Sequence, residues 1–371
     1  MIRLTKPETG GAIDSIGPVL EQGFLVQGKN VARFESMIRE YVGRRHAVAV
    51  NSGTSAIQCA LVALGIGRGD EVILPDFTFP ATANAVVWVG ATPVLADVDP
   101  VTLNISVESV DARLNAKTKA VMLVDLFGLA ADIGGVQAIC QRNGVLLIED
   151  SACAMGALYE GRKCGSFGQA SILSFHPRKI VTTGEGGMVL TDEEEYARTV
   201  RLIRNHGIEP CADGVEFVLA GSNLRMNEIE ACLGIAQMNE IDRLIAARRR
   251  IAGLYDRLLG EIEEIRTPIE PQGCMHTYQS YVVIVKEGID RDRLIVRMKE
   301  CGIETGIGTY AIHVQRFYQD LLGLRPGSLP VSHDAFMHSL SLPIYPSMEE
   351  THVEQVVSNL RECIHQVSTG K

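Results

Sequence analysis

The stretch HAVAVNSGTSAIQCALVALG, residues 46–65, joins a short apolar run to a turn rich in Ser, Gly and Thr and then to a helical pattern. Ile57, Leu61 and Leu64 would share one face of that helix. Apolar runs and helix-like segments continue to alternate along the next hundred residues; the runs are EVILP, TPVLADV, KAVMLVD and GVLLIED. This alternation predicts an α/β fold with a mainly parallel sheet that helices cover on both faces.

The pattern changes after about residue 255. A long helical stretch ends there, YQSYVVIV then alternates like a half-exposed strand, and two amphipathic helical patterns close the chain. We therefore predict a large α/β domain with an N-terminal arm over residues 1–255 and a smaller α+β domain over residues 256–371. The basic run Arg248–Arg250 in the long helix is expected to form a solvated or salt-bridged face.

The composition is typical of a soluble globular protein, with 46% hydrophobic and 22% charged residues. A formal net charge of −10 argues against nucleic acid as a partner. The start of the chain lacks the apolar core of a signal peptide, and no apolar run approaches a membrane span. Nine cysteines without a C-x-x-C pair favour reduced thiols in the cytoplasm. The histidines show no metal-binding spacing, so no metal is predicted.

Common nucleotide and hydrolase motifs are missing or misplaced. GIGRGDEV precedes a predicted strand, whereas a dinucleotide-binding loop would follow one and open a helix. The chain has neither G-x-x-x-x-G-K-[ST] nor G-x-S-x-G. These observations argue against a P-loop nucleotide site and weaken the case for an α/β-hydrolase.

The NSGTSA turn offers two interpretations. Backbone amides and hydroxyl groups at the start of a helix can bind an anion such as phosphate, which the helix macrodipole favours. Ser52 or Thr54 could instead serve only as the N-cap of the helix. The turn alone does not separate these alternatives.

Two other features point to the chemistry of pyridoxal phosphate. GVLLIED ends in Glu149 and Asp150, at the strand edge where parallel sheets bind ligands. Lys179 follows the next apolar run, in SFHPRKIVTTGEGG. Pyridoxal phosphate needs a lysine amine, an acid at its pyridine nitrogen and a cradle for its phosphate, and these features together would supply all three.

The same segments, read in order, resemble the sugar aminotransferase family called DegT/DnrJ/EryC1/StrS. The motifs that carry the resemblance are NSGTSA, GDEVILPDFTFPATANAV, EDSACAMGA, SFHPRKIVTTGEGG and GSNLRMNEIEACLGIAQM. The likeness extends from GFLVQGKNVARFE to LSLPIYPSM. It implies the fold of aspartate aminotransferase (fold type I), with a seven-stranded, mainly parallel sheet and a small C-terminal domain.

The resemblance implies roles for individual residues. Lys179 matches the Schiff-base lysine, and Asp150 matches the acid at the pyridine nitrogen. Phe79 matches the aromatic residue that stacks on the cofactor ring. Cys153 stands beside the phenolic oxygen of the cofactor, where Gln or His is usual; we interpret it as a small buried filler. The implied phosphate-binding residues are Gly53, Thr54 and Ser55 of the turn, Ser174, and Asn223 donated by the second subunit of a homodimer.

Substrate contacts are expected from Phe24, Glu185, Arg225, Tyr310 and His313. Phe24 stands where tryptophan is usual, and Pro80 stands where a β-branched residue is commoner. A structural role is the alternative for Glu185 and for His313.

The expected activity is a two-stage transamination in which Lys179 acts as general base and acid. Glutamate would donate the amino group to a nucleotide-linked 3-keto or 4-keto deoxyhexose, in aminosugar or polysaccharide biosynthesis. Lys179 itself points away from the deoxysugar dehydratase branch, which carries histidine there. A keto-cyclitol substrate, a lyase on the same fold and a non-catalytic regulatory protein that binds the cofactor stay open as alternatives.

Overall fold

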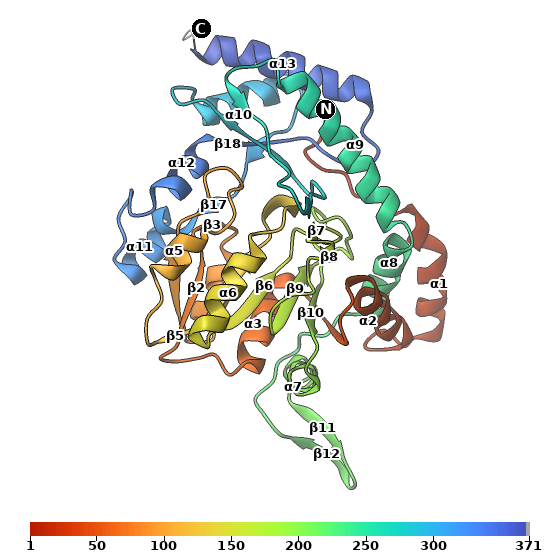
Figure 1. Cartoon of the computed structure of the whole chain (residues 1–371). Helices are drawn as coiled ribbons and strands as arrows, with labels where there is room; N and C mark the ends of the chain where they lie inside the picture. The colour runs from red at the N-terminus through yellow and green to blue at the C-terminus, as the bar shows by residue number, and fades with distance from the viewer. Residues whose placement is uncertain (369–371) are drawn as a thin grey trace.

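The computed structural model describes residues 1–368, and its centre is a seven-stranded sheet (Figure 1). The strand order is β1-β10-β9-β6-β5-β2-β4, and β10 runs antiparallel to both its neighbours while the other pairs are parallel. The predicted mainly parallel sheet is therefore confirmed. The strands are β1 (His46–Val50), β2 (Glu71–Pro75), β4 (Thr92–Ala96), β5 (Thr118–Val124), β6 (Leu146–Asp150), β9 (Ala170–Ser174) and β10 (Gly187–Thr191).

Helices cover both faces of this sheet because alternate strand residues are apolar on both sides. Val48 and Val50 of β1 pack on one face, whereas Ala47 and Ala49 pack on the other. The first face is covered by α3 (Gly53–Ala63), α4 (Ala81–Trp88) and α7 (Glu194–Arg204). The second is covered by α2 (Lys29–Val42), α5 (Val107–Asp111), α6 (Ile133–Asn143) and α8 (Glu228–Met238).

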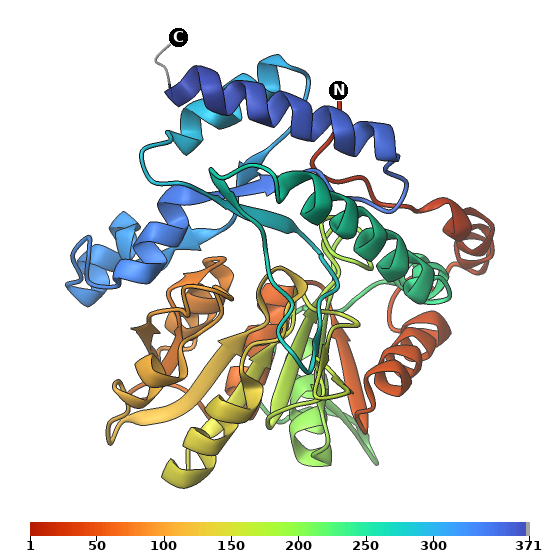
Figure 2. The same cartoon turned by 45° about the horizontal axis from the view of Figure 1, so that its top comes forward.

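A second layer lies across one end of the large sheet (Figure 2). Its core combines a four-stranded sheet in the order β13-β15-β18-β16 with three helices, and Ile2 packs into it. Its elements are α9 (Ile241–Leu259), β13 (Ile265–Arg266), β15 (Tyr281–Val285), α10 (Arg291–Glu300), β16 (Gly306–Ile307), β18 (Ser339–Leu342) and α13 (Glu350–Ser368). Residue 255 falls inside α9, so the division at 255/256 stays a prediction.

The remaining elements are mostly short. They are η1 (Gly10–Ala12), α1 (Ile13–Gln22), β3 (Phe77–Thr78), η2 (Leu126–Gly128), β7 (Leu158–Tyr159), β8 (Arg162–Lys163), β11 (Ile208–Cys211), β12 (Gly214–Phe217), β14 (Cys274–Met275), β17 (Tyr310–Ala311), η3 (Ile312–Val314), α11 (Arg316–Leu322) and α12 (Pro330–His338). The β11–β12 hairpin projects away from the body of the molecule (Figure 1). Within residues 1–368, no helix is both long and apolar enough to span a bilayer.

The basic run in α9 is not uniformly solvated, which corrects the expectation for Arg248. Its side chain is 2% exposed and donates hydrogen bonds to the carbonyl oxygens of Tyr278, Gln279 and Ile344. Burial lowers the pKa of Arg248 to about 10. Arg249 forms an ion pair with Glu270, as expected for a salt-bridged face.

Gly187 at the start of β10 should not tolerate a side chain. A Cβ atom there would lie 2.2 Å from the carbonyl oxygen of Ser52. The clash is with backbone, so Gly187→Ala is expected to lower the free energy of unfolding by about 1–3 kcal/mol. Gly253→Ala is the matched control: it lies in α9 with open space around its Cβ position and should stabilise the chain by about 0.5–1 kcal/mol. Equal denaturation midpoints for the two variants would contradict this prediction.

Candidate active site

The predicted cofactor residues lie along one edge of the large sheet, where its parallel strands end. β1 ends at Val50 just before the NSGTSA turn, β9 ends at Ser174 and β6 ends at Asp150. The strand register pairs Val50 with Gly187 and Gly187 with Ser174. The ends of β1 and β9 are therefore level on either side of β10, next to β6.

The NSGTSA turn contains the predicted N-cap, and its role in binding an anion stays a prediction. Ser52 is the N-cap of α3, and its Oγ accepts a hydrogen bond of 3.1 Å from the Ser55 amide. The amides of Gly53 and Thr54 then lie at the open N-terminus of the helix. A Cβ atom on Gly53 would lie 2.8 Å from Cβ of Ser174. Glycine thus allows the turn to meet the Ser174 hydroxyl, and together they can bind an anion.

Asp150 is a buried acid, 3% exposed, at the end of β6. Its Oδ2 accepts a hydrogen bond of 3.0 Å from Oγ1 of Thr82, and its Oδ1 accepts one of 3.2 Å from the Ala152 amide. Burial raises the pKa of Asp150, while these hydrogen bonds and the positive charge of Lys179 oppose the rise. A cationic ligand group at this carboxylate would favour its charged form. Thr82 was not among the predicted residues.

Lys179 lies in the loop between β9 and β10, and side chains from two distant segments hold this loop. Gln237 of α8 accepts a hydrogen bond of 3.0 Å from the Thr182 amide and donates one of 3.1 Å to the Thr182 carbonyl. Gln279 donates one of 2.7 Å to the carbonyl oxygen of Arg178. Both glutamines are buried. They fix the backbone on either side of Lys179, and sequence analysis missed them.

The amine of Lys179 points to the end of β6. Its Nζ donates a hydrogen bond of 3.0 Å to Sγ of Cys153, three residues beyond Asp150. Both side chains are half-buried. The interpretation of Cys153 as a small buried filler is therefore wrong, because it is half-buried and contacts the lysine amine. The structure brings the predicted nucleophile and the predicted acid into one site.

Phe79 supplies a free aromatic face next to this acid. It follows β3, which pairs with β17, and 63% of its surface is exposed. Its ring centroid is 6.3 Å from that of Tyr310, with the planes at 60°. Thr82, which hydrogen-bonds Asp150, is one helical turn further along the chain. The exposed Phe79 ring can thus stack on a flat ligand.

Asn223 and Arg225 lie beside the NSGTSA turn of their own chain. The Asn51 amide, just before the turn, donates a hydrogen bond of 2.9 Å to the carbonyl oxygen of Leu224. The Arg225 side chain donates one of 2.7 Å to Oδ1 of Asn205, and Asn223 is exposed.

The predicted substrate residues Glu185 and Phe24 are exposed. Phe24 lines a cavity with Gly28 and Glu228. The Glu228 carboxylate accepts hydrogen bonds from amides of the first turn of α2, which fixes this part of the N-terminal arm. Among the described residues, the Glu185 carboxylate makes no hydrogen bond to Lys179, whose side-chain partner is Cys153.

His313 is fully buried, unlike its neighbour Tyr310. Its Nδ1 is 2.6 Å from Oδ2 of Asp76, and its backbone amide donates a hydrogen bond of 2.7 Å to Oδ1 of the same residue. The pair ties η3 to the end of β2. Because no part of His313 is exposed, a substrate contact through it would require the residues around it to move, whereas a structural role needs no change.

Glu149, the other acid of GVLLIED, faces away from Asp150 because adjacent strand residues point to opposite faces. It lies with Asp125 and Cys164 in a fully buried cluster whose possible ligand atoms are within 4.8 Å of one another. Glu149 accepts hydrogen bonds from the amides of Gly165 and Phe167, and Asp125 accepts one from Ser151. These bonds account for the cluster without an ion.

The two buried carboxyl groups should make stability depend on pH. Burial raises the pKa of Asp125 well above its usual range, and the charge of Glu149 adds to the rise. Burial also raises the pKa of Glu149. A carboxyl whose pKa is higher in the folded state favours folding when protonated, so the free energy of unfolding should fall as pH rises through the raised values.

Asp125→Asn should reduce this fall, because its amide can replace the protonated carboxyl without becoming charged. The expected result is a shallower decline of the unfolding free energy from pH 5 towards pH 9, measured by urea denaturation. Asp213→Asn, at the exposed tip of the β11–β12 hairpin, is the matched control and should follow the wild type. Identical pH profiles for Asp125→Asn and the wild type would contradict the raised pKa of Asp125.

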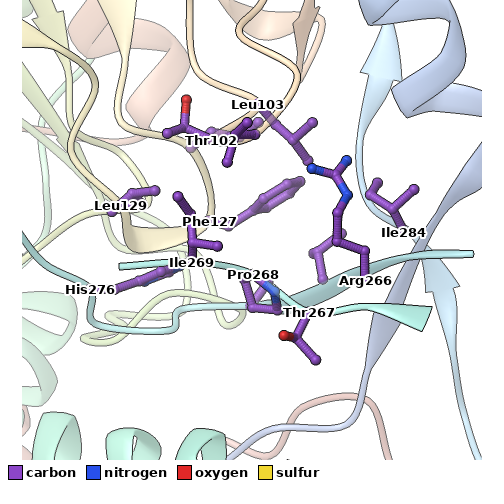
Figure 3. A pocket seen from close by; sticks show the side chains of 14 residues that line it. Thr102, Leu103, Phe127, Leu129, Arg266, Thr267, Pro268, Ile269, His276 and Ile284 are labelled. Atoms are coloured by element: carbon purple, nitrogen blue, oxygen red, sulfur yellow. The ribbon is translucent and has the colours of Figure 1, made fainter. Parts of the chain in front are cut away.

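A cavity between the two layers is separate from this site (Figure 3). On one side of the cavity are the loops that follow β4 and β5, and on the other are strands of the second layer. Arg266 lines the cavity and donates a hydrogen bond of 2.6 Å to the carbonyl oxygen of Pro100. Most of the labelled lining residues are apolar, among them Leu103, Phe127 and Ile284. Neither Lys179 nor Asp150 lines it.

The residues at the sheet edge fit pyridoxal phosphate. The open helix terminus at Gly53 and Thr54 and the Ser174 hydroxyl can hold its phosphate. Asp150 is placed as a buried acid for a protonated ring nitrogen, and the Lys179 amine is held at the same strand end. The exposed Phe79 ring offers a face for stacking.

Comparisons with known proteins agree with this fit. The model of the DegT/DnrJ/EryC1/StrS aminotransferase family matches residues 9–361. SpsC, a spore coat polysaccharide biosynthesis protein of Bacillus subtilis, is 36% identical over 95% of this chain and 94% of its own. GDP-perosamine synthase of Caulobacter vibrioides is 36% identical over 91% of each chain. The crystal structure of S. venezuelae DesV with a ketimine intermediate superimposes with a TM-score of 0.90, at 31% identity over 95% and 94% of the two chains.

Proposed function

The chain belongs to the DegT/DnrJ/EryC1/StrS aminotransferase family, and it is a pyridoxal-phosphate-dependent aminotransferase of the sugar aminotransferase group. On that premise we propose that it transfers the amino group of glutamate to a nucleotide-linked 3-keto or 4-keto deoxyhexose. The relatives named for perosamine synthesis and for spore coat polysaccharide support this choice. The observation that carries the proposal is the Lys179 amine, held by Cys153 next to the buried acid Asp150.

Each residue has a distinct task in the proposed reaction. When bound, pyridoxal phosphate supplies an electron sink for the carbon that loses a proton. The Asp150 carboxylate keeps the ring nitrogen protonated, because a buried charge strongly favours an opposite charge beside it. Gly53, Thr54 and Ser174 would bind the phosphate, and Phe79 would orient the ring. The Lys179 amine would act as general base and then general acid, taking a proton from the carbon of the amino donor.

Product analysis tests the substrate class. The enzyme is incubated with glutamate and a panel of nucleotide-linked 3-keto and 4-keto sugars, and products are identified by mass spectrometry. We expect one panel member to gain an amino group while an equal amount of glutamate becomes its keto acid. If no panel member is aminated but a keto-cyclitol is, the sugar nucleotide assignment is wrong. Formation of keto acid without any acceptor product would argue against the proposed pair of half-reactions.

We further propose a homodimer in which Asn223 of one subunit binds the phosphate in the site of the other. The exposure of the Asn223 side chain supports this role, because an exposed side chain can reach a second subunit, and so do the exposed apolar side chains Ile13, Leu20 and Phe24 of the N-terminal segment. Such a surface on the monomer is typical of an interface. Light scattering should then give twice the mass of one chain.

Mixing two inactive variants tests the shared site. In a dimer of one Lys179→Ala chain and one Asn223→Ala chain, one site would keep both its own Lys179 and the partner-supplied Asn223. After an equal mixture is unfolded and refolded, half of the dimers should be mixed, and each mixed dimer has one intact site of two. About a quarter of all sites should therefore be active. If Asn223 serves its own subunit, no site regains both residues and activity stays at the level of the separate variants.

A further inference from the structure

The Cys153–Lys179 contact joins two nucleophiles in one site. Sγ and Nζ are 3.0 Å apart, although the residues are 26 positions apart in the chain. Both are half-buried, so a small oxidant can reach them. Gln237 and Gln279 fix the backbone on either side of Lys179, which keeps its amine close to the thiol.

We propose that Cys153 and Lys179 form a reversible oxidative cross-link when the cofactor is absent. Peroxide, the oxidant, takes two electrons from Sγ; its O–O bond breaks, and Cys153 becomes a sulfenic acid with release of one water. The Nζ lone pair then attacks sulfur, the S–O bond breaks, and the hydroxyl leaves with an amine proton as a second water. In sum, thiol, amine and peroxide give an S–N bond and two waters. A dithiol returns two electrons and frees both side chains.

The geometry favours this amine over other outcomes for the sulfenic acid. Such an acid reacts with the nearest thiol or nitrogen nucleophile, and here the amine already touches the sulfur. Cys164, the next cysteine in the chain, is fully buried in the cluster with Asp125 and Glu149. Cross-linking would remove the amine that the cofactor needs, so the oxidised chain should not bind pyridoxal phosphate covalently.

Peptide mapping of the cofactor-free full chain tests the bond. After hydrogen peroxide and digestion with an arginine-specific protease, we expect the Cys153 peptide (residues 143–162) and the Lys179 peptide (residues 179–198) to be joined, lighter by two hydrogen atoms than their sum and separated by dithiothreitol. Cys153→Ser should give no such product, and Lys179→Ala should leave oxidised but unlinked Cys153. Cys211→Ser, at the exposed hairpin, should cross-link like the wild type. Oxidised Cys153 beside a free Lys179 peptide in the wild type would overturn the proposal, and so would a linked peptide that carries an added oxygen.

A second experiment uses the cofactor-bound enzyme, and it rests on the proposed function. Borohydride first establishes, in a separate sample, whether cofactor is attached to Lys179. If it is, peroxide should no longer yield the linked peptide, because Nζ is occupied. Attached cofactor together with an undiminished cross-link would overturn the inference. If no cofactor attaches to Lys179, the proposed role of Lys179 in binding the cofactor is wrong. The cross-link in the cofactor-free chain is then still tested by its own peptide map.

Discussion

Replacement of Lys179 by alanine is expected to lower kcat by about 10³-fold or more while leaving the fold intact. The variant loses both the covalent attachment point and the group that moves the proton, and general acid–base catalysis alone contributes about 10²–10⁴-fold. The side chain is half-buried and has one hydrogen-bond partner, Cys153. Its loss should therefore cost little stability, about 1 kcal/mol. Lys117→Ala, an exposed lysine, is the matched control and should keep full activity.

Cofactor attachment gives a readout that does not depend on the substrate. Wild-type enzyme should show a visible absorption band and retain cofactor after borohydride treatment and denaturation. Lys179→Ala should bind pyridoxal phosphate reversibly, through Gly53, Thr54 and Ser174, and release it on denaturation. Added methylamine should restore part of the proton transfer, since a small amine can occupy the space left by the side chain. Fixed cofactor in the variant would show that another residue is the attachment point.

Local patterns in the sequence were enough to predict the sheet and the residues at its edge. Gly53, Asp150 and Ser174 each stand at the end of an apolar run, and parallel strands bring such ends to one edge. The alternation of strand residues then decides which of the two acids, Glu149 or Asp150, lies in the site. Asp150 is on the same face of the sheet as Ile148 and α4, whereas Glu149 points into the core on the opposite face. That choice needs the strand register, which the short run GVLLIED does not contain.

The residues that hold the site were missed because their partners are far away in the chain. Thr82 is 68 positions from Asp150, Gln237 is 55 from Thr182, and Gln279 is 101 from Arg178. No local spacing reports such contacts.

The expectation for Arg248 failed for a related reason. The charge pattern of α9 indicated a basic face, but the carbonyl groups that receive Arg248 belong to loops after residue 277. Only the packing of the second layer reveals that this face is covered.

Asp150→Asn should reduce activity and yet not destabilise the cofactor-free chain. Asparagine can keep the hydrogen bonds to Thr82 and Ala152, because Oδ1 still accepts from the amide and the Thr82 hydroxyl can turn to accept from Nδ2. It cannot supply the negative charge that holds a proton on the ring nitrogen. Loss of one such electrostatic contact in a buried site lowers kcat by about 10²–10³-fold. Cofactor attachment to Lys179 should persist, which separates this variant from Lys179→Ala.

The pH dependence of stability supplies the second test of Asp150. Burial raises its pKa in the folded chain, so the free energy of unfolding should fall as pH rises from the unfolded carboxyl value, about 3.9, through the raised one. Asparagine does not ionise, so this decrease is absent from the variant. Without cofactor, the free energy of unfolding of the variant should therefore increase relative to that of the wild type as the pH rises to 8. With cofactor bound, the order should reverse, because the carboxylate of the wild type then faces a cation. If the wild type is the more stable of the two at pH 8 without cofactor, burial does not disfavour the charged form of Asp150, and its role as the acid for the ring nitrogen loses this support.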